Sequence, residues 1–117
     1  MNVTIDAHST IPPFEQLRVQ VIELISTGDL VAGTRLPTVR RLAADLALAT
    51  NTVARAFKEL EAAGFIETRG RAGSFVRPQD FPERAALEAA EAYAERIHEL
   101  GVTREAALGY VEAVLRR

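Results

Sequence analysis

The sequence predicts a mainly α-helical chain with one small β-hairpin. Two observations support this fold class: apolar residues recur at three- and four-residue steps along most of the chain, and two β-prone segments flank a glycine-containing tip. Glycines and prolines separate the periodic stretches. The chain has 117 residues, of which 48% are hydrophobic and 26% charged, so it can bury a packed core in one small domain with an appendage.

The first predicted helix spans residues 12–27. Two prolines suit its first turn, and Gly28 supplies a stop at its C-terminal end. Residues 29–35 are interpreted as a connecting turn. The apolar positions of the helix are Phe14, Leu17, Val21, Leu24 and Ile25.

A second helix is predicted after Pro37, which disfavours helix in the residue before it, and the hydroxyl of Thr38 is a candidate cap. A break at residues 47–49 leads to a third helix over residues 50–63, which Gly64 ends. The core-facing positions of these two helices are Val39, Leu42, Ala43, Leu46, Val53, Ala56, Phe57 and Leu60.

A β-hairpin is predicted next, because the β-prone residues 65–69 and 74–77 flank the glycine-containing residues 70–73. Two helices separated by about three residues and followed by a hairpin with arginines near its tip describe a winged helix-turn-helix. In that fold the third helix enters the major groove of DNA, so the sequence predicts a DNA-binding domain.

The formal net charge of −2 gives no sign of a polyanion-binding protein, but the charges are unevenly distributed. Residues 35–77 carry eight basic and four acidic side chains, a net charge of +4, whereas residues 1–34 and residues 78–117 each carry −3. Because binding to nucleic acid depends on the local field rather than on total charge, the middle of the chain is the candidate DNA-binding region.

The candidate DNA contacts are polar or basic side chains at outward positions of this region. Short side chains at the start of the third helix suit base edges or phosphates, and long cations further along suit phosphates. Two alternatives stay open: the arginines are ordinary solvated charges, and Thr50 and Thr52 cap the helix. The candidate residues are Thr38, Arg40, Arg41, Thr50, Asn51, Thr52, Arg55, Lys58, Arg69 and Arg71.

Beyond a proline-bracketed linker, two further helices are predicted over residues 83–100 and 103–116. Both bury limited apolar area alone, so their stability must come from packing, most simply against a second copy of the chain. We therefore expect a winged helix-turn-helix domain over residues 1–77 and a helical hairpin for dimerisation over residues 78–117. Packing within the monomer and binding of a partner helix remain alternatives. The candidate dimer contacts are Ala90, Tyr93, Ile97, Leu100, Leu108, Val111, Val114 and Leu115.

An ordered, nearly continuous set of short matches over residues 12–77 resembles the N-terminal domain of the GntR family of bacterial regulators. The short two-helix tail is similar to the YtrA-like subfamily, whose members lack a large effector-binding domain. The matching segments are residues 13–17, 28–30, 33–40, 51–53, 60–66 and 71–76.

The resemblance implies a repressor that binds a pseudo-palindromic operator as a homodimer, with Arg40 and the start of the third helix at the DNA and the hairpin near the minor groove. The chain departs from the family pattern at four positions. Ala47 stands where glycine is frequent, Ala49 where serine is, and Thr50 and Ala54 where many members carry arginine. Base discrimination is therefore expected to shift toward Asn51, Thr52 and Arg55.

Several classes of chemistry find no support. The chain has no cysteine, which excludes disulfides and thiolate zinc sites, and its two histidines are far apart, so no metal is expected. No serine has an evident base nearby, and residues 28–35 lack the lysine of a phosphate-binding loop. We expect neither an enzyme nor a cofactor. The alternative functions are a winged-helix module that binds protein rather than DNA and, with less support, a phosphate-handling enzyme.

Location and further partners are only partly constrained by the sequence. The N-terminal residues do not resemble a secretory signal, and no apolar run approaches the length of a membrane span, so we expect a cytoplasmic protein with no membrane partner. A small-molecule effector stays open. Without a large effector domain, such a ligand would bind at the dimer interface or between the two domains, and nothing in the sequence identifies its chemistry.

Overall fold

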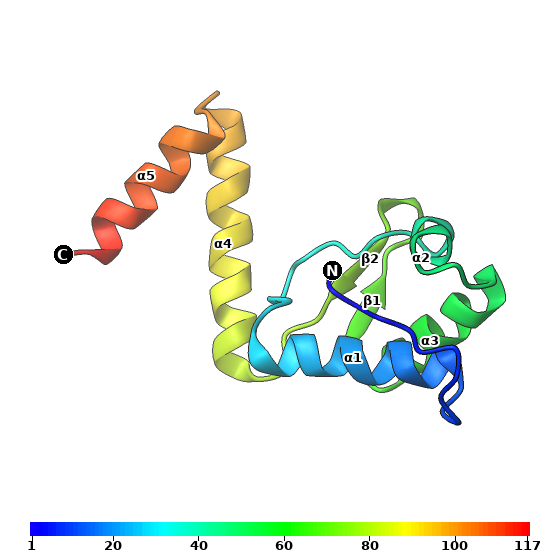
Figure 1. The fold of residues 1–117 in the computed structure, drawn as a ribbon. Coiled ribbons are helices and arrows are strands. Elements are labelled where there is room, and N and C mark those ends of the chain that lie inside the picture. Colours follow the sequence, from blue (N-terminus) through cyan, green and yellow to red (C-terminus); the bar gives the residue numbers. More distant parts are fainter.

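The computed structural model describes residues 1–117, and its fold is the predicted winged helix-turn-helix with C-terminal helices (Figure 1). Residues 1–77, called the head below, form a three-helix unit with a hairpin, and residues 78–117, called the arm, project from it as two helices. The elements are α1 (Pro13–Thr27), α2 (Val39–Leu46), α3 (Thr50–Ala62), β1 (Ile66–Thr68), a 3₁₀ turn (Gly70–Ala72), β2 (Ser74–Val76), α4 (Phe81–Glu99) and α5 (Arg104–Leu115).

The core lies in the head, where α3 packs against both α1 and α2. Fully buried side chains include Leu17 and Val21 of α1 and Val53 and Leu60 of α3, which follow the predicted helical spacing. Ile66 of β1 closes the cluster. Only one of the twelve buried residues of the chain, Ala107, belongs to the arm, so the head carries nearly all of the hydrophobic stabilisation.

The two-stranded hairpin has a further backbone partner that the sequence does not predict, because the segment before α2 pairs with β2 through an isolated β-bridge between Arg35 and Phe75. Gly33 donates its N–H to the carbonyl of Val76 at 2.8 Å, Val76 donates to Thr34 at 2.9 Å, and Leu36 donates to Ser74 at 2.8 Å. The interpretation of residues 29–35 as a connecting turn therefore misses only the bridge at Arg35. A single bridged residue leaves no alternating apolar pattern that a short window can detect.

Helix α2 begins and ends as its sequence indicates. Thr38 is its N-cap, and the hydroxyl oxygen accepts a hydrogen bond from the N–H of Arg41 at 3.0 Å. Ala47 ends the helix in the left-handed conformation, with φ of 55° and ψ of 43°. This is the only non-glycine residue with positive φ in the chain, and it occupies the position where the family pattern favours glycine.

We expect Ala47→Gly to raise the free energy of unfolding by about 0.5–1 kcal/mol, since relief of left-handed strain exceeds the entropy that glycine adds to the unfolded chain. The side chain of Ala47 is exposed, so little packing is lost. Urea denaturation at one protein concentration measures the change. The matched control is Ala44→Gly, in the exposed interior of α2, which should destabilise by about 0.5–1 kcal/mol. A loss of stability at Ala47 equal to that at Ala44 would contradict the strain.

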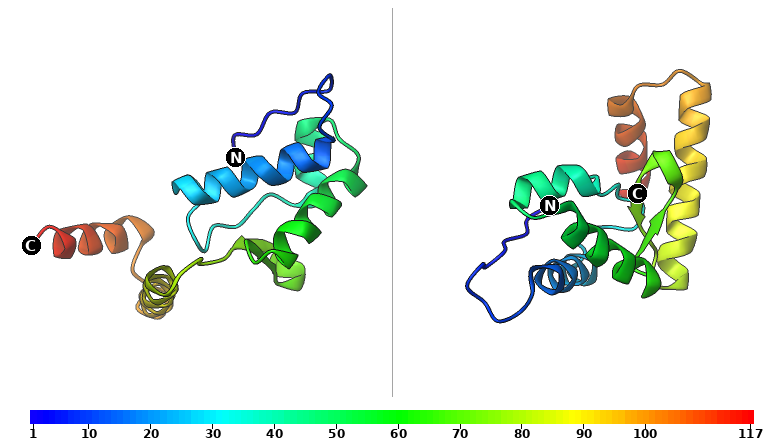
Figure 2. Two further views of the ribbon diagram at one scale, coloured as in Figure 1. Left: turned by 90° about the horizontal axis from the view of Figure 1, so that it is seen from below. Right: turned by 90° about the vertical axis from the view of Figure 1, so that its right-hand side faces the viewer.

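The arm makes the molecule elongated. Its radius of gyration is 16.7 Å, and its principal extents are 51, 25 and 22 Å, whereas a compact chain of this length has a radius of gyration of about 13 Å. Figure 2 shows α4 end-on, with α5 directed away from the head. Asp80 caps α4 by accepting from the N–H of Glu83 at 2.8 Å, and Thr103 caps α5 by accepting from Ala106 at 3.2 Å.

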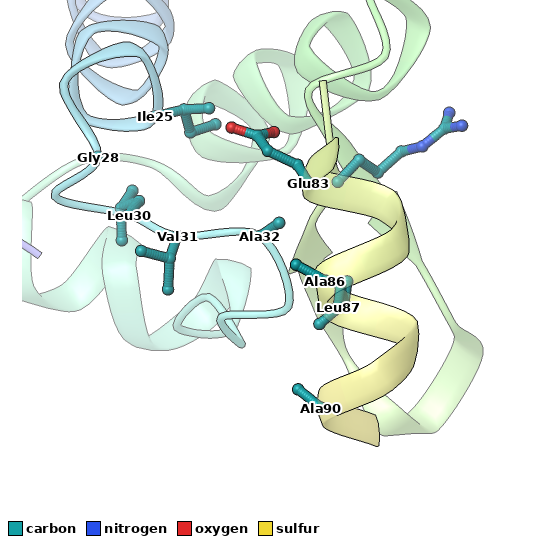
Figure 3. A pocket seen from close by; sticks show the side chains of 10 residues that line it. Ile25, Gly28, Leu30, Val31, Ala32, Glu83, Ala86, Leu87 and Ala90 are labelled. Atoms are coloured by element: carbon teal, nitrogen blue, oxygen red, sulfur yellow. The ribbon is translucent and has the colours of Figure 1, made fainter. Parts of the chain in front are cut away.

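The arm contacts the head at Gly33 as well as through Gln79, whose side-chain amide donates to the carbonyl of Gly64 at 3.1 Å. A Cβ added at Gly33 would lie 2.6 Å from the Cδ1 atom of Leu87, so α4 approaches the backbone directly at this glycine, whose φ is +91°. Around this contact remains an open hollow of about 320 Å³ between α4 and the loop after α1 (Figure 3). Its walls are mainly apolar and include Leu30, Val31 and Ala86.

Candidate nucleic-acid interface

The start of α3 presents free polar groups. Thr50 and Asn51 are exposed in the first turn, and Thr52 is half-buried. The N-cap is Ala49, and no side chain caps the helix, so the alternative of Thr50 or Thr52 as a cap is not what the structure contains. The positive end of the α3 dipole and its first N–H groups therefore lack a side-chain partner, an arrangement that favours an anion such as a phosphate.

The predicted cations fall into two groups. Arg40, Lys58 and Arg71 are exposed and make no ion pair. Three other arginines each form an ion pair with an acidic side chain of the same chain. An unpaired cation can approach a phosphate without first breaking an internal contact. Arg41 lies 3.4 Å from Asp45, Arg55 lies 3.8 Å from Glu59, and Arg69 lies 2.6 Å from Glu67.

The wing, defined as residues 66–76, holds one paired and one free arginine. Arg69 donates to Glu67 at 2.6 Å, and its guanidinium carbon lies 4.8 Å from the centre of the Phe75 ring. The hydrogen bond from Arg69 lowers the pKa of the Glu67 carboxyl below its ordinary value. Arg71 lies in the 3₁₀ turn at the tip and has no such partner, so it is the more available of the two wing arginines.

Arg35 is a candidate that the sequence analysis missed. Arg35 forms an isolated β-bridge with Phe75, and its side chain lies beside the wing, since a Cβ added at Gly73 would be 3.0 Å from the Arg35 Nε atom. Arg35 also lines a surface groove of about 620 Å³ together with Thr38 and Arg41. The signal that could have found it is its place in the basic segment, which the assignment to a turn obscured.

The arm brings together four of the eight predicted dimer contacts, Tyr93, Val111, Val114 and Leu115. Tyr93 donates its hydroxyl to the carbonyl of Ala107 at 2.9 Å, which joins α4 to α5. A hollow of about 260 Å³ between the two helices is lined only by Tyr93, Tyr110, Val111, Val114 and Leu115. Tyr110 was not predicted, although it is three residues from Ala107 and shares its face of the helix. Ala90 lies elsewhere, on the wall of the hollow at the head.

The structure contains neither a cluster of metal-binding side chains nor a membrane-spanning helix. No group of three or more histidine, cysteine, aspartate or glutamate side chains is placed to bind a metal ion. None of the helices combines the length and the apolar character that a membrane crossing requires.

A three-helix head followed by a two-stranded wing defines the winged helix-turn-helix class, a fold typical of DNA-binding proteins. Residues 13–76 match the family described as bacterial regulatory proteins, gntR family. The chain belongs to the GntR family of transcriptional regulators.

Two relatives and one solved structure support this assignment. The chain is 46% identical over 110 residues to the HTH-type transcriptional regulator Rv1152 of Mycobacterium tuberculosis, covering 94% of this chain and 91% of that protein. It is 44% identical over 75 residues to the HTH-type transcriptional repressor YtrA of Bacillus subtilis, covering 63% of this chain and 57% of that protein. The structure of YtrA from Sulfolobus acidocaldarius, a GntR-family transcription factor, aligns with a TM-score of 0.61 and 26% identity over 97% of each chain. The YtrA-like assignment is thereby confirmed.

Proposed function

We propose that this chain is a transcriptional repressor that binds a pseudo-palindromic operator as a homodimer, with residues 1–77 reading DNA and residues 78–117 forming the dimer. The observation that carries the proposal is the start of α3, where Thr50 and Asn51 are exposed and no side chain caps the first N–H groups of the helix. The name of the Bacillus subtilis relative supports the repressor role. Repression follows from occupancy, because a dimer bound at a promoter excludes the polymerase.

The proposed division of labour on DNA follows from side-chain chemistry. Thr50, Asn51 and Thr52 contact base edges or nearby phosphates from the N-terminal turn of α3, because their short side chains allow close approach to the groove. Six basic side chains of the head contact phosphates, which fixes the register without reading sequence. Arg71 enters or borders the minor groove from the tip of the wing. The proposed phosphate contacts are Arg35, Arg40, Arg41, Lys58, Arg69 and Arg71.

The arm supports the homodimer. Leu108 is 57% exposed, Val114 52% and Leu115 79%, although all three are large apolar side chains. Exposed apolar surface of this kind on helices with almost no buried residue needs a partner, and a second copy supplies the same surface by symmetry. A two-fold dimer places its recognition helices about 34 Å apart, which matches successive major grooves on one face of DNA.

Selection of bound duplexes from a random pool tests the proposal directly. We expect the enriched sequences to contain two inverted half-sites about one helical turn apart. If each subunit neutralises about four phosphates, the plot of log affinity against log salt concentration for the dimer should have a slope near −7. A slope near zero, or enrichment of no sequence, would contradict the proposal and favour the alternative of a protein-interaction module.

Arg40→Ala and Asn51→Ala separate the two kinds of contact. Arg40→Ala should weaken binding to operator and random DNA alike by about tenfold and reduce the salt slope, whereas Asn51→Ala should weaken binding to the operator and leave random DNA nearly unaffected. The matched control is Arg104→Ala, which removes an unpaired cation at the start of α5. Unchanged operator affinity in both head variants, measured by fluorescence anisotropy, would show that another face binds DNA.

A further inference from the structure

One aromatic ring and four charged side chains join α1 to the recognition helix α3, and together they are called the α1–α3 clamp. The guanidinium carbon of Arg55 lies 3.7 Å from the centre of the Phe14 ring. Glu59 divides its two carboxylate oxygens between the helices, with Oε1 3.8 Å from Nε of Arg55 and Oε2 3.8 Å from Nε of Arg18. The members of the clamp are Phe14, Glu15, Arg18, Arg55 and Glu59.

Arg18, the second arginine of the clamp, contacts two carboxylates, those of Glu59 and Glu15. Arg18 donates from Nε to Glu15 at 3.2 Å and from a terminal nitrogen to the other oxygen of the same carboxylate. These hydrogen bonds lower the pKa of the Glu15 carboxyl, so it remains ionised at neutral pH. The clamp therefore holds two positive and two negative charges, and it adds no net positive charge to the basic surface.

The guanidinium of Arg55 is turned toward α1, although its position on α3 is close to the proposed DNA contacts. Arg55 is four residues after Asn51 and three before Lys58, so helical spacing alone would place it on their side of the helix. Arg55 and Glu59 are four residues apart and share the side that contacts α1, as their distances to Phe14 and Arg18 show. To reach a base, the Arg55 guanidinium would have to leave both the Phe14 ring and Glu59.

We infer that Arg55 is a positioning residue: it fixes α3 against α1 so that Asn51 and Thr50 meet the DNA in one register, and it makes no DNA contact itself. The inference rests on the proposed function. Hydrogen bonds to base edges tolerate only a few tenths of an ångström in donor–acceptor distance, so a recognition helix must be held firmly by the residues behind it. Attraction to phosphates depends far less on such precision.

The test compares Arg55→Met, Phe14→Leu and the double variant, using the operator obtained by selection. Each single change should lower operator affinity by about two- to fivefold, the range expected for loss of one exposed cation–π contact. Affinity for random DNA and the salt slope should stay at their wild-type values. Because the ring and the guanidinium act through one contact, the double variant should be no weaker than either single variant.

Phe14→Tyr is the conservative control, since it keeps the ring face and should keep the wild-type operator affinity. Thermal unfolding of every variant shows whether the substitution destabilises the fold. Affinities are compared at a temperature well below the unfolding midpoint of each variant. A fall of the salt slope by about 1 in Arg55→Met, with Phe14→Leu unchanged, would show a direct phosphate contact and overturn the inference. A wild-type chain that prefers no duplex would instead overturn the proposed function, and the role of the clamp with it.

Discussion

Replacing Val111 and Val114 by glutamate is expected to convert the dimer into a monomer and to lower operator affinity by about 10²- to 10⁴-fold, since each half-site then loses the effective concentration that the other supplies. Both side chains line the apolar hollow of the arm, where the pairing of two copies would bury four unpaired carboxylates. Sedimentation velocity measures the oligomeric state, and fluorescence anisotropy measures affinity for the operator.

The control places the same two charges on the other side of the same helix. Gly109 and Ala113 are exposed, and a Cβ at Gly109 would meet no atom within 4 Å. The double variant Gly109→Glu with Ala113→Glu should therefore remain a dimer with unchanged operator affinity. Persistence of the dimer in the Val111 and Val114 variant would place the interface outside the arm hollow.

Leu60→Ala is expected to lower the free energy of unfolding by about 2–5 kcal/mol, the range for truncating a fully buried leucine. Leu60 has no exposed surface and belongs to the cluster in which α3 meets α1 and β1, so the cavity has packed elements on several sides and cannot collapse easily. The midpoint of thermal unfolding should fall by about 10 °C or more. Urea denaturation provides the free energy, at one protein concentration because the proposed dimerisation would also stabilise the fold.

A truncation on the surface of the head provides the comparison. Val31 is 62% exposed, and Val31→Ala should change the free energy of unfolding by less than about 0.5 kcal/mol. A similar loss in both variants would mean that the packing described for α3 does not carry the stability of the head.

The sequence predicts the helices well because their signals are local. The predicted limits of α1 to α5 lie within one or two residues of those observed, since caps such as Thr38 and stops such as Gly28 act on the adjacent backbone. The limit for α4 was the least accurate: Pro82 was assigned to a linker, but it lies in the first turn of the helix, where proline is tolerated.

The features that sequence reasoning missed depend on contacts between distant segments. The pairing of residues 33–36 with β2 involves positions about forty residues apart, which no local pattern encodes. The contact of Arg55 with the Phe14 ring depends on how α1 crosses α3, which the sequence of α3 does not encode. The ion pairs of Arg41 with Asp45 and of Arg55 with Glu59 follow from four-residue spacing within one helix, so they could have been predicted.

The hydrogen bonds between the segment before α2 and β2 have a mechanical consequence. The N–H of Leu36 donates to the carbonyl of Ser74 in the wing, and α2 begins only three residues later, so the wing cannot tilt without carrying the start of α2 with it. The distance between the wing and the helix-turn-helix, which we propose to contact the minor and the major groove, is thus set before any duplex arrives. The DNA rather than the protein must then change shape on binding. Among DNA sites that offer the same contacts, those whose central base-pair steps bend readily should be bound more tightly than stiff ones.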